Sequence, residues 1–277
     1  FTSISKNASV SNLIYNKILL NKASLIKDWN APEQTNTKHI IIDNLLPDEL
    51  CTEIYDSFPK DSEGFHSRST FRERKKTSAN MSLYNKIINE AIYAFQDEKI
   101  LNIISEITSI KGLEADKKLY AGGLSIMERG DFLNPHIDNS HNIKREKYRR
   151  LNILYYVTPN WCIENGGNFE LWDAKVKRQK TIVSKFNRIV LMETTQDSWH
   201  SVSKVLTTLP RYCVSNYYFS KNSPNKNNNK YFHVTSFTGR PEENFKRVYG
   251  SVDNYFRNKI SIILKAGRGK KLINHKK

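Results

Sequence analysis

The sequence has few cysteines: its 277 residues include three, which lie far apart and form no CxxC pair. An odd and sparse set of this kind does not build a disulfide framework and is typical of a reducing compartment. We therefore expect a cytoplasmic protein.

Long apolar runs are also missing. No segment approaches the roughly 18 consecutive apolar residues that a membrane-spanning helix requires. Residues 1–30 lack the central apolar region of a signal peptide. We expect neither a membrane span nor a secretion signal in this sequence.

Acidic residues are scarce relative to basic ones: 28 Asp or Glu stand against 44 Lys or Arg, for a formal net charge of +16. The excess is concentrated in residues 221–277, where fourteen Lys or Arg face three acids. Such a basic end favours contact with phosphate, acidic glycan, nucleic acid or an anionic membrane surface, and it is equally typical of a solvated face. Both interpretations stay open, including a peripheral membrane contact through this end.

The spacing of apolar residues changes near residue 118. Before that point they recur three or four positions apart, which predicts helices in residues 1–36, 47–58, 82–95 and 99–108. The polar residues between the second and third of these helices, 58–80, predict a loop. We expect three parts: an N-terminal helical extension (1–37), a main domain (38–220) and a basic C-terminal extension (221–277) with a helix from about Pro241.

After residue 118 the sequence reads as short strands separated by turns. The candidate strands are LYAGGLSIME, NPHIDN, RLNILYYVT, GNFELWD, TIVSKF, NRIVLMET, HSVSKV and RYCVSNYYF. Eight closely spaced short strands predict a mainly β barrel or double-sheet jelly roll with flanking helices.

The main chemical signal is His136-x-Asp138 within one candidate strand. Residues i and i+2 of a strand point to the same face, so an imidazole and a carboxylate project side by side. His200 follows at the start of another candidate strand. Two histidines and one carboxylate form the facial triad of non-haem Fe(II) oxygenases. An HxD alone is more typical of a surface or core histidine that is hydrogen-bonded to the aspartate.

Arg211 strengthens this interpretation. It lies eleven residues after His200, in the otherwise apolar and aromatic strand RYCVSNYYF. A buried guanidinium there requires a partner, and its planar fork matches the two oxygens of a carboxylate such as the distal one of 2-oxoglutarate. A salt bridge to an acid of the chain is the alternative.

One ordered set of segments resembles the prolyl-4-hydroxylase-like branch of the 2-oxoglutarate/Fe(II) oxygenases over roughly residues 38–220: HIIIDNLLPDEL, NPHID, RLNILYYVTPNW, GGNFELWD, NRIVLMETTQDSWHSVSKV and PRYCVSNYYF. The resemblance implies a catalytic double-stranded β-helix, iron held by His136, Asp138 and His200, and 2-oxoglutarate on Arg211. It also implies O2 as a substrate, with ascorbate as a reductant. The family usually carries a hydroxyl two residues after this arginine, whereas Cys213 stands here.

Further cosubstrate contacts are expected from Asn152, Tyr120 and Ser215. Asn152 begins the strand after the HxD segment, and Ser215 lies on the same face of its strand as Cys213. Tyr120 can reach the pocket as well, and so can Tyr155, although strand tyrosines are commonly core residues.

Residues 139–150, which follow the HxD segment directly, are strongly basic. Lys144, Arg145 and Arg149 in this stretch are candidates for substrate binding in a lid over the site, and their charge favours an anionic substrate. A solvated connecting loop is the alternative.

The resemblance therefore predicts a dioxygenase that hydroxylates an unactivated C–H of its substrate and releases succinate and CO2. An acidic sugar or glycan is one substrate class, and a prolyl or other amino-acid side chain is the alternative. A nucleic-acid substrate is less favoured, because the sequence shows no aromatic-rich insertion for base flipping. A non-catalytic β-helix that binds an anionic glycan or nucleic acid, and a metalloenzyme that does not use 2-oxoglutarate, remain as rivals.

Overall fold

The structure of the chain is a computed structural model that describes residues 9–33, 35–62, 64–225 and 232–263. The helices are α1 (Val10–Leu20), α2 (Lys22–Asn30), α3 (Asp48–Asp56), α4 (Lys86–Ala94), α5 (Glu98–Thr108) and α6 (Asn244–Ile263). The strands are β1 (His39–Asp43), β2 (His66–Ser69), β3 (Glu73–Ser78), β4 (Glu114–Ala115), β5 (Gly123–Met127), β6 (Phe132–Ile137), β7 (Tyr148–Tyr156), β8 (Phe169–Trp172), β9 (Gln179–Ile182), β10 (Arg188–Glu193), β11 (His200–Val202), β12 (Arg211–Ser220) and β13 (Ser236–Phe237).

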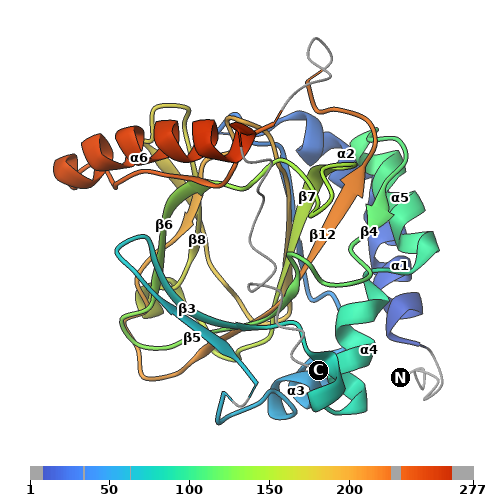
Figure 1. Ribbon diagram of the computed structural model, residues 1–277. Helices are drawn as coiled ribbons and strands as arrows, with labels where there is room; N and C mark the ends of the chain where they lie inside the picture. The colour runs from blue at the N-terminus through green and yellow to red at the C-terminus, as the bar shows by residue number, and fades with distance from the viewer. Residues whose placement is uncertain (1–8, 34, 63, 226–231, 264–277) are drawn as a thin grey trace.

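The strands of the described residues form one curled antiparallel sheet with the order β1-β10-β7-β12-β5-β3-β6-β11-β8-β9. One wall consists of β10, β7, β12 and β5, and the other consists of β6, β11 and β8, with β3 pairing to both β5 and β6. Figure 1 shows β6 and β8 facing β7 and β12 across the interior, with β3 and β5 closing one side. The mainly β architecture expected from the sequence is confirmed.

The helices α4 and α5 illustrate why the first wall is stable. Each begins at a side chain that accepts a backbone hydrogen bond, Asn85 from the N–H of Ile88 and Asp97 from the N–H of Lys99. The isoleucines of α5 are buried on one face, as three-and-four spacing predicts. Figure 1 shows α1, α4 and α5 on the outer side of β12, whereas α6 lies apart from them across β6 and β8.

Strand β7 separates the helix-backed core from the interior. Leu151, Ile153 and Tyr155 belong to the main hydrophobic core together with residues of α1, α4 and α5. The alternate residues Asn152 and Leu154 line the internal cavity instead. The period of two along this strand therefore decides which side chains are available for chemistry.

Each of the eight candidate strands contains or overlaps an observed strand, and the expected helices are present, including one from Asn244 onward. The expected loop at residues 58–80 is wrong, because it contains the hairpin β2–β3. The alternation of apolar and polar residues that usually marks a strand is missing from β3, because Glu73, Lys75 and Thr77 line the cavity and are as polar as the residues between them. The expected three-part division of the chain stays a prediction, and residues 226–231 and 264–277 of its C-terminal part lie outside the described residues.

No helix in the described part of the chain has the length and apolar character needed to cross a bilayer.

Asn187 joins the first wall to α3, and its loss should be the costliest polar change in the fold. Its side chain is fully buried, accepts hydrogen bonds from the Leu46 N–H (3.1 Å) and the Tyr155 hydroxyl (3.0 Å), and donates to the Leu46 carbonyl (2.7 Å) and to Asp48 (2.8 Å). Asn187→Ala should lower the free energy of unfolding by about 3–5 kcal/mol, a decrease of roughly 6–15 °C in melting temperature by calorimetry.

Asn160 provides the matched control for this change. It has the same left-handed backbone, with φ of 55° against 58° for Asn187, but it is exposed. Asn160→Ala should cost about 1 kcal/mol or less. Equal losses at the two positions would show that backbone strain, and not the buried hydrogen bonds, carries the effect.

Candidate active site

Strand pairing brings the three candidate metal ligands together. His136 on β6 and His200 on β11 are directly opposed in the antiparallel ladder, and their ring centroids are 4.0 Å apart. Asp138 follows two residues after His136, just beyond the end of β6, so its carboxylate projects to the same side. Asp138 and His200 are 62 residues apart in the sequence, and the pairing of β6 with β11 brings them together.

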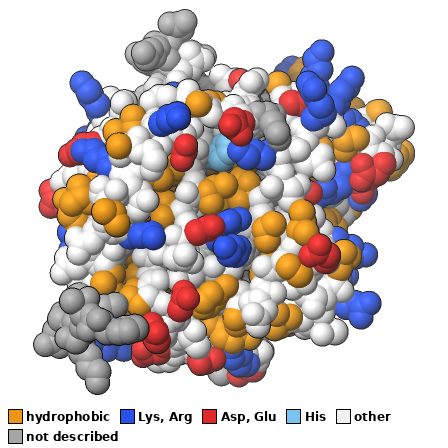
Figure 2. Space-filling model, turned by 180° about the vertical axis from the view of Figure 1, so that it is seen from behind, with side chains coloured by type: hydrophobic (Ala, Val, Ile, Leu, Met, Phe, Trp, Pro, Cys, Tyr) orange, Lys and Arg blue, Asp and Glu red, His pale blue; other side chains and the backbone are white. Residues whose placement is uncertain are grey.

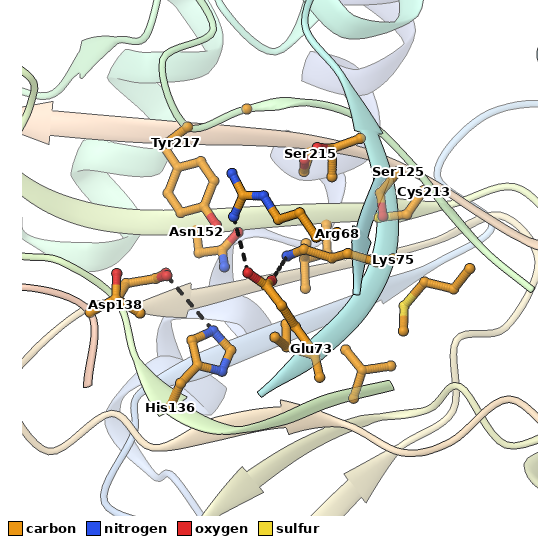
Figure 3. Close-up of a pocket in the computed structure, with 18 of the residues that line it drawn as sticks. Arg68, Glu73, Lys75, Ser125, His136, Asp138, Asn152, Cys213, Ser215 and Tyr217 are labelled. Carbon is orange, nitrogen blue, oxygen red and sulfur yellow. Dashed lines mark hydrogen bonds and ion pairs between the residues drawn. The ribbon is translucent and has the colours of Figure 1, made fainter. Parts of the chain in front are cut away.

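The donor atoms of these residues face one another at the distances of a metal site. His136 Nε2 is 3.8 Å from Asp138 Oδ1, and His200 Nε2 is 3.7 Å from Asp138 Oδ2. The three donor atoms lie within 4.8 Å of one another, and all three residues are buried. Figure 3 shows His136 and Asp138 facing each other at one side of the pocket.

The hydrogen bonds of the two histidines leave the inward nitrogens free to bind a metal. His136 Nδ1 is 3.0 Å from the Asn134 carbonyl, and His200 Nδ1 is 2.9 Å from the Ser198 carbonyl. A carbonyl only accepts, so each Nδ1 carries the proton and each Nε2 presents its lone pair. Burial lowers the pKa of both imidazoles, that of His136 to about 3, so both are neutral at pH 7. A pair of neutral imidazoles with one carboxylate suits Fe(II) or a similar divalent ion.

Arg211, the first residue of β12, lies in the same pocket without a carboxylate of the chain beside it. Its side chain is buried, its Nε donates to Ser184 Oγ (3.1 Å), and its guanidinium lies 4.9 Å from the ring of Tyr156. In the described parts of the chain, no acidic side chain forms an ion pair with it. A buried guanidinium without a counter-ion is costly, so the carboxylate of a bound ligand fits this position.

Tyr156 was not singled out from the sequence, whereas its neighbour Tyr155 was. Burial raises the pKa of the Tyr156 phenol to about 12, so the hydroxyl beside Arg211 stays protonated and can donate. Tyr155 points to the opposite side of β7, where its hydroxyl donates to Asn187. The alternation along β7 is the signal that distinguishes the two tyrosines.

Arg211 and the three metal ligands line a cavity of about 440 Å³, together with the expected cosubstrate contacts Asn152, Tyr120 and Ser215. Figure 2 shows a hollowed face of the molecule, with a histidine in the hollow and basic and acidic side chains beside apolar surface. This volume accommodates a small dicarboxylate and part of a substrate. The roles of the lining residues toward a ligand stay predictions.

Asn152, Ser215 and Cys213 each have a distinct position in the cavity wall. Asn152 is buried, and its amide oxygen has no hydrogen-bond partner within the described segments. Ser215 donates to the Gly123 carbonyl at 3.0 Å, which leaves its oxygen able to accept. Cys213 lies between Arg211 and Ser215 on this face, and burial raises the pKa of its thiol to about 11.

Arg149 was predicted to bind substrate, and it lies beside the candidate metal ligand Asp138. Its NH1 is 3.2 Å from Asp138 Oδ1, its side chain is 2% exposed, and its guanidinium lies 4.3 Å from the ring of Tyr217. Burial lowers the pKa of Arg149, but Asp138 together with the nearby Tyr217, Tyr120 and Asp116 raises it by more, so the net pKa is raised and Arg149 is cationic. Its Nε and NH2 have no hydrogen-bond partner among the residues that the structure describes.

Lys144 and Arg145, the other two candidates for substrate binding, do not line this cavity. Lys144 is exposed, and Arg145 stacks on Phe232 at 4.0 Å and lines a second, shallow hollow. Their assignment to substrate stays a prediction.

The hairpin β2–β3 adds charged residues at the mouth that the sequence did not indicate. The Glu73 carboxylate forms ion pairs with Arg68 at 3.1 Å and with Lys75 at 3.2 Å. Figure 3 shows the Glu73 carboxylate between these two cations, facing the side of the pocket that holds His136. The mouth is therefore lined by ionic groups, with more cations than anions.

Comparison with known proteins agrees with this geometry. Residues 122–219 match the model of the 2OG-Fe(II) oxygenase superfamily, whose members are named for Fe(II) and 2-oxoglutarate. The prolyl 3-hydroxylase OGFOD1 of Mus musculus is 29% identical over 77 residues, which are 26% of this chain and 14% of that protein. The chain thus covers a small part of the length of this curated relative.

Solved structures of low sequence identity share the fold. A prolyl hydroxylase of Trichoplax adhaerens, in complex with a hypoxia-inducible-factor peptide, has a TM-score of 0.52 at 16% identity, covering 74% of this chain and 92% of that one. A prolyl-4-hydroxylase of Pseudomonas putida has a TM-score of 0.54 at 12% identity, covering 73% and 100%. The expected double-stranded β-helix is thereby confirmed, and residues 122–219 of this chain are similar to the 2OG-Fe(II) oxygenase superfamily.

Proposed function

We propose that this protein is an Fe(II)- and 2-oxoglutarate-dependent dioxygenase that hydroxylates a C–H bond of a substrate held near Arg149. The observation that carries the proposal is one buried pocket that combines the two-histidine, one-carboxylate set with an arginine free of protein carboxylates. When bound, Fe(II) and 2-oxoglutarate supply O2-dependent decarboxylation, which oxidises R–H to R–OH and yields succinate and CO2.

The chain's own residues provide position, charge and exclusion of water. His136, Asp138 and His200 would supply the donor atoms that hold the metal. Arg211 anchors the distal carboxylate of 2-oxoglutarate, with the protonated phenol of Tyr156 beside it. Both walls of the β-helix line the cavity, and the metal donors and Arg211 are buried, which limits their contact with bulk water.

The rival readings explain less of the pocket. A non-catalytic binding module gives no reason for three converging metal donors, and a metalloenzyme without 2-oxoglutarate gives none for the buried Arg211. Both rivals predict that 2-oxoglutarate does not bind to the metal-loaded protein.

The substrate class follows from the unsatisfied groups near the metal. The Nε and NH2 of Arg149 have no hydrogen-bond partner in the described structure. Because an unpaired buried donor is costly, we expect an oxygen of the substrate to accept a hydrogen bond from each of them. The cations Arg68 and Lys75 at the mouth favour an anionic substrate, such as an acidic sugar or glycan. A peptidyl proline is the second candidate, which the prolyl hydroxylases among the similar proteins favour and whose backbone carbonyl can also serve as the acceptor.

The proposal is tested by anaerobic titration of 2-oxoglutarate into the Fe(II)-loaded protein, followed by its visible charge-transfer absorption. A saturable band that disappears in His200→Ala supports the proposal. A metal-loaded protein that shows no band contradicts it. Succinate release in the presence of acidic sugars, proline-containing peptides and free amino acids then separates the two substrate classes.

Arg149→Met should raise the KM for substrate about 10- to 100-fold, because the matched apolar side chain removes the donors that face the substrate. The affinities for metal and 2-oxoglutarate should change less than the KM for substrate. Lys144→Met is the control: it removes a cation from the same segment, outside the cavity, and should leave the KM unchanged. Equal effects of the two changes would assign the effect to general charge and remove Arg149 from substrate binding.

A further inference from the structure

Helix α6 is attached to the β-helix by its polar side. Asn254 accepts a hydrogen bond from the Phe237 N–H (3.0 Å) and donates to the Phe237 carbonyl (2.8 Å), and Asn258 accepts one from the Val234 N–H (3.1 Å). Asp253 forms an ion pair with Arg72 at 2.6 Å. These contacts come from one face of the helix, so the docking of α6 uses directed polar interactions and little apolar burial.

The opposite face of α6 is apolar and exposed to solvent. Its large apolar side chains have exposed fractions from 46% to 84%: Phe245, Val248, Tyr249, Val252, Tyr255, Phe256 and Ile260. At about 100° per residue they occupy an arc of roughly 140° on one side of the helix. Figure 1 shows the helix lying along the outside of the molecule, apart from α1, α4 and α5.

This orientation is the reverse of an ordinary surface helix, whose apolar side faces the core. Exposed apolar patches of this extent mark surfaces that bind a partner or a membrane. Tyr249 also contacts Phe71, itself exposed, at a ring distance of 5.2 Å, which extends the patch onto the loop between β2 and β3. The apolar face of α6 is therefore not used to pack the helix against the β-helix.

Charge indicates what covers this face. Lys259 lies within the apolar arc, exposed, with its ammonium 4.7 Å from the centre of the Tyr255 ring. A second copy or an apolar protein groove would have to bury this ammonium, and lysine is depleted from the centres of protein interfaces. At a lipid surface its stem lies along the acyl boundary while the ammonium reaches the phosphates.

The sequence beyond the helix carries the same sign of charge. Residues 264–277 contain six Lys or Arg and no acid, and the whole chain has a formal net charge of +16. Clusters of four to eight cations next to an amphipathic helix favour anionic lipid headgroups. We infer that α6 is a membrane-docking helix whose exposed apolar face inserts at the surface of a bilayer rich in anionic lipid.

Docking by α6 would bring the catalytic pocket to the lipid surface. Arg257 on the inner side of α6 and Phe237, which is hydrogen-bonded to Asn254, both line the cavity. The inference concerns attachment alone, and it holds whether or not the proposed hydroxylase activity is correct.

The test is flotation of the purified full-length protein with vesicles of phosphatidylcholine alone, or of phosphatidylcholine with about one third phosphatidylglycerol. The wild type should float with the anionic vesicles only, and raising the salt from about 0.1 M to about 0.5 M should weaken this binding. Phe245→Ser combined with Phe256→Ser should reduce the bound fraction at least about tenfold, because both side chains lose their apolar contact with lipid.

The matched control combines Leu20→Ser with Leu206→Ser, two exposed apolar residues on other surfaces. It should float like the wild type, and circular dichroism should show that all variants are folded. Lys259→Glu, a change of charge within the arc, should also release the protein.

Three outcomes would overturn the inference. They are absence of flotation by the wild type, equal flotation with both vesicle compositions, and flotation unchanged by the α6 substitutions. A dimer that light scattering shows to be dissociated by the α6 double substitution, without vesicle binding, would assign the apolar face to a second copy instead.

Discussion

Replacing Asp138 by alanine is expected to abolish metal-dependent turnover and to weaken divalent metal binding by at least about 1000-fold. Loss of a side chain that only orients a metal ligand typically costs 10- to 100-fold, and Asp138 supplies a donor atom itself. Its two oxygens face His136 and His200 at 3.8 and 3.7 Å, so Asp138 is the carboxylate of the three-residue metal set. Calorimetric titration with Co(II), which does not oxidise readily, measures the affinity, and succinate release measures turnover.

Asp138→Ala also leaves Arg149 without its ion-pair partner, so the change in stability must be separated from the change in metal binding. Asp138→Asn keeps the size of the side chain and should lose the metal as well. Asp131→Asn is the matched control, since Asp131 is also buried and ion-paired, with Arg74 at 2.8 Å, but outside the cavity. It should lower the melting temperature and leave the metal affinity unchanged. Retention of Co(II) binding by both Asp138 variants would remove that residue from the metal site.

Replacing Arg211 by methionine is expected to raise the 2-oxoglutarate requirement about 30- to 3000-fold while leaving metal affinity unchanged. Removing one partner of a buried, hydrogen-bonded charge pair costs about 2–5 kcal/mol, and each 1.4 kcal/mol is a factor of ten. Methionine has a similar length and no charge, and the pocket wall already contains Met127 beside the guanidinium. Succinate formed as a function of 2-oxoglutarate concentration gives the measurement.

The same variant has a distinctive effect on stability. Because Arg211 is buried without a protein carboxylate, Arg211→Met should leave the melting temperature of the ligand-free protein unchanged or higher. 2-Oxoglutarate with a divalent metal should raise the melting temperature of the wild type and fail to raise that of the variant. An unchanged 2-oxoglutarate requirement would exclude Arg211 as the anchor.

Arg188 is the natural comparison for Arg211. It is bonded to Asp43 through two nitrogens at 2.5 and 2.8 Å, so its counter-ion lies within the protein. Arg188→Met should lower the melting temperature and leave the 2-oxoglutarate requirement unchanged. The hydrogen bond from Arg188 also holds the pKa of Asp43 below its usual value, so this pair stabilises the fold above the unfolded pKa and loses that effect as pH falls through the lower, folded one.

The sequence predicted those parts of the site that depend on local spacing. His136-x-Asp138 places two ligands on one face of a strand because the strand period is two, and the structure brings His200 opposite His136. Arg211 was predicted because a cation in an apolar strand requires a partner, and the structure buries it in the same cavity. Each of these inferences needs only the neighbours of a residue along its own strand.

Other parts could not be obtained from spacing. The hairpin β2–β3 appeared to be a loop, since its cavity-facing residues Glu73, Lys75 and Thr77 are as polar as its outward ones. Tyr155 and Tyr156 are adjacent and chemically identical, and only the direction in which β7 faces the core separates them. The sequence of the basic segment 139–150 does not show which of its cations are buried. In the structure Arg149 is buried beside Asp138, whereas Lys144 is exposed.

The sequence by itself determined the strand periods, the amphipathic character of α6 and the residue types of the metal set, because these are properties of neighbours along the chain. The tertiary structure alone decided which polar residues meet in the cavity, and that α6 turns its polar side inward and its apolar side to solvent. The physical reason is that burial and hydrogen-bond partners depend on strands and loops far apart in sequence. Asn254 meets Phe237, and His200 meets His136, only after the sheet has closed.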